Sequence, residues 1–386
     1  DETAQFIRMN MFPILNKLFK SRKSLNIKIL KIKNDNLELL QKIQININEL
    51  VLDVNNYYIF DKSEDILHVL GVLFEDKHNK TSNMNNNNEN NINKTINNLM
   101  KNKTLITNFT SNLKANELQE NQTLDNGLVT ISKLNEILKS LNNKTSAGID
   151  NIPNIIFKKL PLNIEKHYCT IINNAINNAY FPKEWKVAII IPIIKPGKDP
   201  TNPYNYRPIS LLPNLSKILE KILKNYIINT TNELQILNDT QFGFREKHST
   251  IHAINKLVSD ICWHINNKES ISALLIDLSD AFTSIWTNGL IYKLIKYKFP
   301  VHLIKIIYNM ITEKSFKLKA NGFTSNKIYK INNGLQQGTV TSPILFILFI
   351  NDLLNIINNH EKNNFGIAFA DDIIIYTANK NYHILQ

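Results

Sequence analysis

Apolar and polar positions follow two periods along the chain, and each period predicts one type of element. Apolar residues recur at helical spacing over 131–141 and 215–226, so each run predicts a helix with one buried face. The runs VAIIIPII at 187–194 and RPISLL at 207–212 predict two strands. The turn-rich loop KPGKDPTNPY at 195–204 separates these strands. Together they predict a β-hairpin.

The C-terminal third alternates between the two periods. SALLIDL predicts a strand that ends at Asp277, and helical patterns follow over 287–297 and 301–311. Asn321 and Gly322 stand between two alternating runs, which is a strong hairpin signal. We therefore expect an α+β fold.

A second hairpin is predicted around the sequence FADD at 369–372. It places two adjacent carboxylates, Asp371 and Asp372, between the apolar runs GIAFA and IIIY. Shortly before it, Ser342 and Pro343 fit the N-cap and first position of a helix whose first turns, ILFILFI, are apolar all round. Such a helix must be covered on every side, so we expect it beneath a sheet that carries the FADD hairpin.

Three aspartates are the candidate chemistry of this chain. Asp277 and the pair Asp371 and Asp372 lie far apart in sequence, and they converge if their strands are neighbours. Clustered carboxylates repel one another unless divalent cations lie between them, and two magnesium ions about 4 Å apart are a standard device for phosphoryl transfer. In the structural alternative, the pair forms a polar turn and Asp277 caps the following helix. The pattern alone leaves both interpretations open.

Charge extends the picture toward a polyanionic partner. The net charge is +12 and the pI is about 9.3, although Asn, Ile and Lys all have A/T-rich codons, so charge alone does not decide for nucleic acid. Lys195, Lys198 and Arg207 would place three cations at the tip of the first hairpin, where a triphosphate could be held. Without the acidic site, a solvated surface loop would explain them as well.

Composition divides the chain into three parts. Residues 1–79 mix short amphipathic and strand-like pieces and carry no recognisable chemistry. Residues 80–122 are polar and rich in Asn, so we expect a flexible linker there, with an aggregation-prone tract or a binding segment as alternatives. Regular elements fill 123–386. No apolar run reaches the roughly 18 residues of a membrane span, so we expect no membrane partner.

Six blocks in this last part resemble, in order, the reverse transcriptase domain of non-LTR retrotransposons, particularly the jockey-like elements of insects. The resemblance runs from about Val129 to Tyr376. The blocks are KTSAGIDNIPNIIFKKLP, WKVAIIIPIIKPGKDPTNPYNYRPISLLPNLSKILEKIL, QFGFREKHSTIHAI, LLIDLSDAFTSIW, GLQQGTVTSPILFILFINDLL and FADD. It implies a right-hand polymerase with fingers at about 123–270 and a partial palm at about 271–386, where helices back an antiparallel sheet. The N-terminal part would then be a helical extension.

The resemblance also implies a role for each site residue. Asp277 and Asp371 would hold the metal ions, with Asp372 supporting them. Lys195 and Arg207 match residues that contact the incoming triphosphate. Three more residues match positions around the nucleotide. Phe282 matches the aromatic gate that crowds a ribose 2′-hydroxyl. Gln337 and Gly338 match the loop that packs against the nucleotide and the template.

The chain departs from the family pattern in two respects. Thr283 stands where members usually have an aspartate, which puts the local structure after Phe282 in question. The sequence ends at Gln386, soon after Asp372, so we expect the remaining palm motifs and the thumb to be missing. The chain thus resembles a fragment of a longer polyprotein.

The resemblance implies an RNA-directed DNA polymerase that adds deoxynucleotides to a primer 3′-hydroxyl. Two Mg²⁺ ions, or Mn²⁺ in their place, would be the cofactors. An RNA template, a DNA primer and deoxynucleoside triphosphates would be the partners, and the oligomeric state stays open. Action would be nuclear, after a cytoplasmic ribonucleoprotein stage. The alternative is an inactive relic that only binds nucleic acid.

Overall fold

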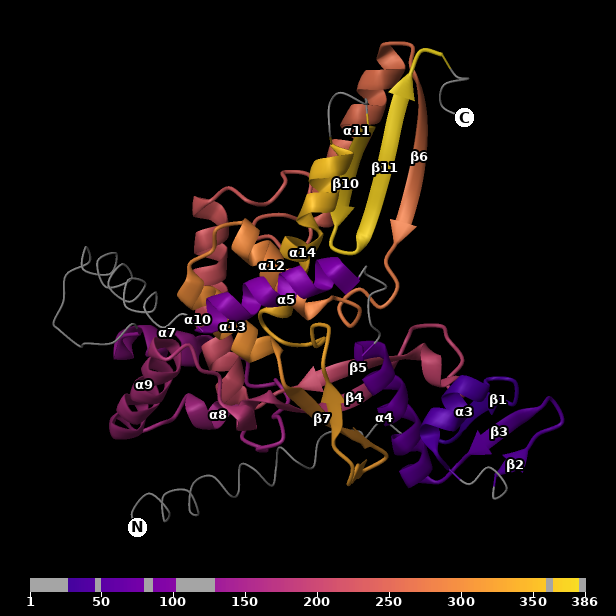
Figure 1. Cartoon of the computed structure of the whole chain (residues 1–386), viewed down its shortest axis with the longest axis vertical. Coiled ribbons are helices and arrows are strands. Elements are labelled where there is room, and N and C mark those ends of the chain that lie inside the picture. Colours follow the sequence, from indigo (N-terminus) through magenta and orange to yellow (C-terminus); the bar gives the residue numbers. More distant parts are fainter. Residues whose placement is uncertain (1–26, 46–49, 80–85, 102–128, 359–363, 382–386) are drawn as a thin grey trace.

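The computed structural model describes residues 27–45, 50–79, 86–101, 129–358 and 364–381. They form a mixed α+β molecule with three sheets (Figure 1). Within these residues, no helix combines the length and the apolar character needed to cross a membrane.

The central sheet has five strands, and the predicted hairpin forms one side of it, with β5 at the edge. β4 (Val187–Ile194) and β5 (Tyr206–Leu211) pair antiparallel, with Ile193 opposite Arg207. β7 (Lys314–Ala320) joins β4 in parallel and turns back at Asn321 and Gly322. β8 (Phe323–Thr324) and β9 (Tyr329–Ile331) pair with β7 and complete what we call the β4 sheet. The hairpin of β4 and β5 and the hairpin at Asn321 and Gly322 are both confirmed. Nothing in the local pattern indicated that β7 pairs in parallel with β4.

A second sheet carries the FADD turn. β6 (Ser270–Asp277), β10 (Asn364–Phe369) and β11 (Asp372–Asn379) are antiparallel, with β11 in the middle. We call it the β6 sheet, and Figure 1 shows it at one end of the molecule. α14 (Ser342–Ile357) packs beneath it, where Leu354 joins a cluster with Ala368 and Ile373. The predicted covered helix is confirmed, but Thr341 is its N-cap, so Ser342 and Pro343 lie one position further into the helix than expected.

Helices surround the two sheets and supply most of the core. Leu134, Leu219, Ile291, Ile307 and Leu345, each from a different helix, are fully buried together. Leu345 belongs to α14, and the other helices of this group are α7 (Ile131–Ser140), α8 (Asn154–Phe157), α9 (Leu162–Asn177), α10 (Asn214–Glu233), α12 (Thr287–Lys296) and α13 (Val301–Ile311). α11 (Thr250–Asn266) instead packs against the β6 sheet, where Ala253 joins a cluster with Ile367 and Tyr376. All four helical patterns predicted over 131–141, 215–226, 287–297 and 301–311 are confirmed.

The N-terminal lobe, residues 27–79, is mixed rather than helical. It has a three-stranded sheet of β1 (Leu30–Lys33), β3 (Tyr57–Phe60) and β2 (Val51–Leu52), together with α3 (Leu37–Ile43) and α4 (Ser63–Asn79). The expected helical extension is therefore wrong for these residues, because alternating residues of β1 are buried against the helices. Phe74 of α4 shares one buried cluster with Phe316 and Tyr329 of the β4 sheet, so the lobe and that sheet have a common core.

The flexible linker expected over 80–122 is wrong for residues 86–101. They form α5 (Asn86–Lys101), which packs against α12. Ile92, Ile96 and Leu99 recur at helical spacing and join the main core, and Asn93 Oδ1 accepts a hydrogen bond from Asn288 at 2.8 Å. The few apolar residues of this Asn-rich stretch lie on one face, which average composition does not reveal. The rest of the predicted linker lies outside the described residues.

Candidate active site

A cleft of about 620 Å³ lies where the β4 sheet, the β6 sheet and α4 meet. Most of the predicted site residues line it, namely Lys195, Arg207, Asp277, Phe282, Gln337, Gly338 and Asp371, whereas Lys198 and Asp372 do not. Asp372 instead borders a neighbouring hollow that it shares with Asp277. The structure therefore brings the predicted cations, carboxylates and gate residue into one region, although they come from four segments of the chain.

The three aspartates meet at the end of the β6 sheet. Asp277 and Asp372 are directly opposite each other on β6 and β11, so both side chains leave the same face. Asp371 lies in the two-residue turn before β11. Burial raises the pKa of Asp371, and the neighbouring charges of Asp372 and Asp277 raise it further, while Arg207 lowers it. The convergence expected from sequence is confirmed.

None of these carboxylates forms an ion pair with another described residue. As they stand, no three His, Cys, Asp or Glu side chains in the described part of the chain are grouped closely enough to hold a metal ion. The donor type nevertheless fits a hard divalent cation, because carboxylate oxygens are its preferred ligands and their mutual repulsion is otherwise uncompensated.

Gln241 and Gly243 hold the FADD turn, and sequence analysis assigned neither of them a role. Gln241 Oε1 accepts hydrogen bonds from the backbone N–H of Gly243 at 2.8 Å and of Ala370 at 3.1 Å. A Cβ at Gly243 would lie 2.1 Å from the nitrogen of Ala370, so only glycine permits this contact. Phe242 N–H donates to Ala368 O at 2.8 Å, and Ala368 N–H donates to Thr240 O at 2.9 Å.

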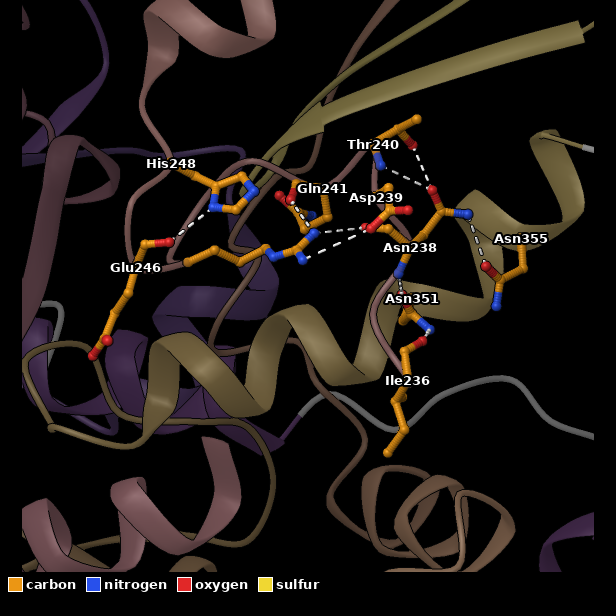
Figure 2. Close-up of polar contacts among 10 residues, drawn as sticks. Ile236, Asn238, Asp239, Thr240, Gln241, Glu246, His248, Asn351 and Asn355 are labelled. Carbon is orange, nitrogen blue, oxygen red and sulfur yellow. Dashed lines mark hydrogen bonds and ion pairs between the residues drawn. The ribbon is translucent and has the colours of Figure 1, made fainter. Parts of the chain in front are cut away.

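A polar network ties this supporting loop to α14 (Figure 2). Arg245 Nη1 donates to the carbonyl oxygens of Asn238 at 3.0 Å and Gln241 at 3.1 Å. Asn238 N–H in turn donates to Oδ1 of the buried Asn351 at 2.8 Å, and Asn351 Nδ2 donates to Ile236 O at 2.8 Å. α14 therefore anchors the loop, and the loop in turn holds the FADD turn that contains Asp371. The block QFGFREKHSTIHAI marked this loop in the sequence, but its partners are distant in the chain.

The loop that carries Gln337 and Gly338 is fastened to β5 beside Arg207. Ser210 N–H donates to Gln337 O at 2.8 Å. Gly338 has a φ of +99°, and a Cβ there would lie 2.9 Å from Ser210 O. Beneath the loop, the buried Glu220 accepts the N–H of Val340 at 2.7 Å and the Ser216 hydroxyl at 3.1 Å, while burial raises its pKa. Glu220 is a second supporting residue that sequence analysis missed.

Phe282 is half-buried in a short aromatic stack. Its ring lies 5.0 Å from that of Phe346 and 5.9 Å from that of Phe244, centroid to centroid. Leu335 N–H donates to Phe282 O at 2.7 Å. Thr283, which departs from the family pattern, is buried and donates its hydroxyl to Asp280 O at 3.1 Å. Threonine therefore fits this position without an unpaired charge, and the turn after Asp277 keeps its structure.

Comparison with known proteins agrees with this geometry. Residues 193–385 match the family model described as reverse transcriptase (RNA-dependent DNA polymerase). The chain is 35% identical over 256 residues to the probable RNA-directed DNA polymerase from transposon BS of Drosophila melanogaster, covering 65% of this chain and 28% of the relative. It is 32% identical over 256 residues to the RNA-directed DNA polymerase from mobile element jockey of the same fly, covering 66% and 28%.

Two further matches complete the comparison. The probable RNA-directed DNA polymerase from transposon X-element of Drosophila melanogaster is 29% identical over 248 residues, covering 64% of this chain and 27% of the relative. A solved structure of apo telomerase from Candida tropicalis, truncated from its C-terminal domain, aligns with 14% identity and a TM-score of 0.39 over 57% of this chain and 50% of that one, too low to bear on the fold. The chain thus spans little more than a quarter of the length of these transposon relatives.

The family model covers half of the chain, including both strands around the FADD turn and β6 with Asp277. Its match supports a polymerase fingers and palm fold of mixed α+β content for this chain. The chain belongs to the reverse transcriptase (RNA-dependent DNA polymerase) family, with its curated relatives among jockey-like non-LTR transposons.

Proposed function

We propose that this chain is an RNA-directed DNA polymerase that adds deoxynucleotides to a primer 3′-hydroxyl, copying RNA into DNA. One observation carries the proposal: Asp277 and Asp371 line the same cleft as Lys195, Arg207 and Phe282. Acidic and basic groups within one cleft suit a substrate whose triphosphate is anionic and whose reacting centre needs cations.

The fingers residues would bind and orient the nucleotide. Arg207 lies on β5 and Lys195 directly follows the end of β4, so both can hold phosphate oxygens in the cleft. The guanidinium of Arg207 can do so with two parallel bonds. Gly338 lets the backbone of its loop approach the substrate closely, and the Gln337 amide can donate to it. Phe282, held between Phe244 and Phe346, would exclude a 2′-hydroxyl by its bulk.

Asp277 and Asp371 would hold two Mg²⁺ ions, or Mn²⁺ in their place, with Asp372 supporting them. The raised pKa of Asp371 and the repulsion among the three carboxylates support this assignment. When bound, such ions would activate the attacking hydroxyl and stabilise the leaving pyrophosphate.

The partners follow from this reaction. They would be an RNA template, a DNA primer and deoxynucleoside triphosphates, and the net charge of +12 favours association with the two nucleic acids. If chromosomal DNA supplies the primer, the enzyme acts in the nucleus after a cytoplasmic ribonucleoprotein stage. The fingers would extend over about 123–270 and the palm from about 271.

Primer extension on an RNA template tests the proposal. We expect the wild-type chain to incorporate the templated deoxynucleotide with Mg²⁺, and Asp277→Asn to lose at least about 10³-fold in rate, because a metal-binding carboxylate is removed. Asp239→Asn, an exposed aspartate outside the cleft, is the matched control and should retain activity. Binding of template and primer without incorporation by any of the three proteins would instead indicate the inactive nucleic-acid binder.

A further inference from the structure

The N-terminal lobe reaches into the candidate active site through α4. Leu73, Asp76 and Lys77 line the same cleft as Asp277 and Phe282. Lys77 Nζ lies 2.8 Å from Asp280 Oδ1, and these two residues are 203 positions apart in sequence. Lys77 is 8% exposed and Asp280 38%, so the cation is the buried member of the pair.

Asp280 occupies a demanding position between Asp277 and Phe282. Its φ is +52°, a left-handed conformation that costs free energy for any residue with a side chain. Its carbonyl oxygen accepts hydrogen bonds from Thr283 Oγ1 at 3.1 Å and Ser284 N–H at 3.0 Å, which begin the turn beyond Phe282. The Asp280 side chain is thus bound by α4 while its backbone shapes the turn that carries Phe282.

The end of α4 is held by a second set of contacts that also leads to Phe282. His78 Nδ1 donates to Asn333 O at 3.1 Å, and Asn333 N–H donates to His78 O at 3.1 Å. Two residues further on, Leu335 N–H donates to Phe282 O. The helix and the turn of residues 278–284 are therefore connected at both the side chain of Asp280 and the backbone of Phe282.

We propose that Lys77 is a positioning residue of the polymerase site. Through its ion pair with Asp280, Lys77 fixes the turn that sets Phe282 relative to Asp277, and the N-terminal lobe thereby takes part in selecting the sugar of the incoming nucleotide. The proposal rests on the polymerase function proposed above. An ion pair between two exposed side chains would contribute little to the stability of this turn. Loss of the Asp280 carboxylate, in contrast, leaves the buried Lys77 ammonium without its partner, which strongly destabilises its surroundings.

The variants Lys77→Met and Asp280→Asn test the pair. Methionine retains the length of the lysine side chain without its charge, and asparagine tolerates a positive φ, so the charge is the main property removed in each. Lys31→Met is the matched control. Like Lys77, Lys31 is a lysine of the N-terminal lobe that pairs with an aspartate, here Asp53 at 2.9 Å, but it does not line the cleft. The double variant and the exchanged pair, Lys77→Asp with Asp280→Lys, complete the set.

Two measurements are made on every variant. The first is the ratio of kcat/KM for a deoxynucleotide to that for the matching ribonucleotide. We expect it to fall about tenfold in each single variant and no further in the double variant, with partial recovery in the exchanged pair and no change in Lys31→Met. The second is hydrogen exchange of residues 278–284, which should become faster in both single variants and in the double variant, and should stay unchanged in Lys31→Met.

The outcomes separate this inference from the proposed function. If the wild type incorporates nucleotides and the ratio is unchanged in Lys77→Met and Asp280→Asn, the positioning role is overturned. If the wild type incorporates no deoxynucleotide at all, the proposed function fails, and hydrogen exchange alone then decides whether Lys77 fixes the turn. If hydrogen exchange over 278–284 is unchanged in both single variants, the role of Lys77 in fixing the turn is overturned as well.

Discussion

At the scale of single residues, the cleft depends on side chains whose positions are set by their packing. Phe282 is the clearest case, because two aromatic neighbours and a backbone hydrogen bond hold its ring at the cleft wall. A ring held in this way can discriminate by volume, which a mobile side chain could not do.

The variant Phe282→Ala tests that discrimination. Removing the ring opens space beside the sugar, so ribonucleotide incorporation should rise about tenfold or more relative to deoxynucleotide incorporation. The measurement is the ratio of kcat/KM values in single-nucleotide extension. Phe346→Leu, which alters the stack but does not line the cleft, should change the ratio less. A wild type that accepts both sugars equally would contradict the role of Phe282.

Local sequence signals were sufficient to identify the residues whose own side chains face the substrate in the proposed site. Asp277, Asp371, Lys195 and Arg207 could be found because strand patterns placed them at strand ends and in turns. Lys77 and Gln241 could not, because each acts through a partner more than a hundred positions away in the chain, Asp280 and Ala370 respectively. Such pairs become visible only when the tertiary packing is known.

At the scale of elements, the FADD hairpin is positioned by the loop of residues 238–245 rather than by its own turn. The loop reaches the turn at Gly243 and is itself anchored on α14 through Asn351. Strands and helices of this region were predictable from periodicity. The parallel pairing of β7 with β4 and the packing of α5 on α12 were not, because neither leaves a local signature.

The variant Gly243→Ala tests this support. The added Cβ would meet the backbone of Ala370, so the loop must move and the turn with Asp371 moves with it. Because displacements of about 1 Å can cost roughly 10²-fold in rate, we expect a loss of that order in primer extension. Gly322→Ala, strained by its φ of +81° but outside the cleft, should lower thermal stability with little effect on rate. A Gly243→Ala enzyme with the wild-type rate would show that the loop does not position Asp371.

At the scale of the whole molecule, the N-terminal lobe and the β4 sheet share one core, and His78 lies at their junction with the segment that supports Phe282. Burial, together with the nearby charge of Lys314, lowers the pKa of His78 from 6.5 to about 3. Between these two values the unfolded chain binds a proton that the folded chain does not. The free energy of unfolding must therefore fall as pH decreases from 6.5 toward 3.

Denaturant unfolding at pH 7 and pH 5 measures this contribution. Between pH 7 and pH 5 the free energy of unfolding of wild type should fall by about 2 kcal/mol more than that of His78→Gln. The reason is that uptake of one proton on unfolding changes this free energy by up to about 1.4 kcal/mol per pH unit. Contributions from groups other than His78 are present in both proteins and cancel in the difference. Parallel pH profiles for the two proteins would mean that His78 is not buried in its neutral form.

The central claim is that Asp277 and Asp371, distant along the chain, bind divalent cations in the cleft with Asp372 beside them. Equilibrium binding of Mn²⁺, followed by electron paramagnetic resonance with primer, template and deoxynucleotide present, tests it most directly. We predict that wild type and Asp239→Asn bind Mn²⁺ alike, and that Asp371→Asn binds at least about tenfold more weakly. Equal Mn²⁺ affinity in Asp371→Asn and wild type would contradict the account.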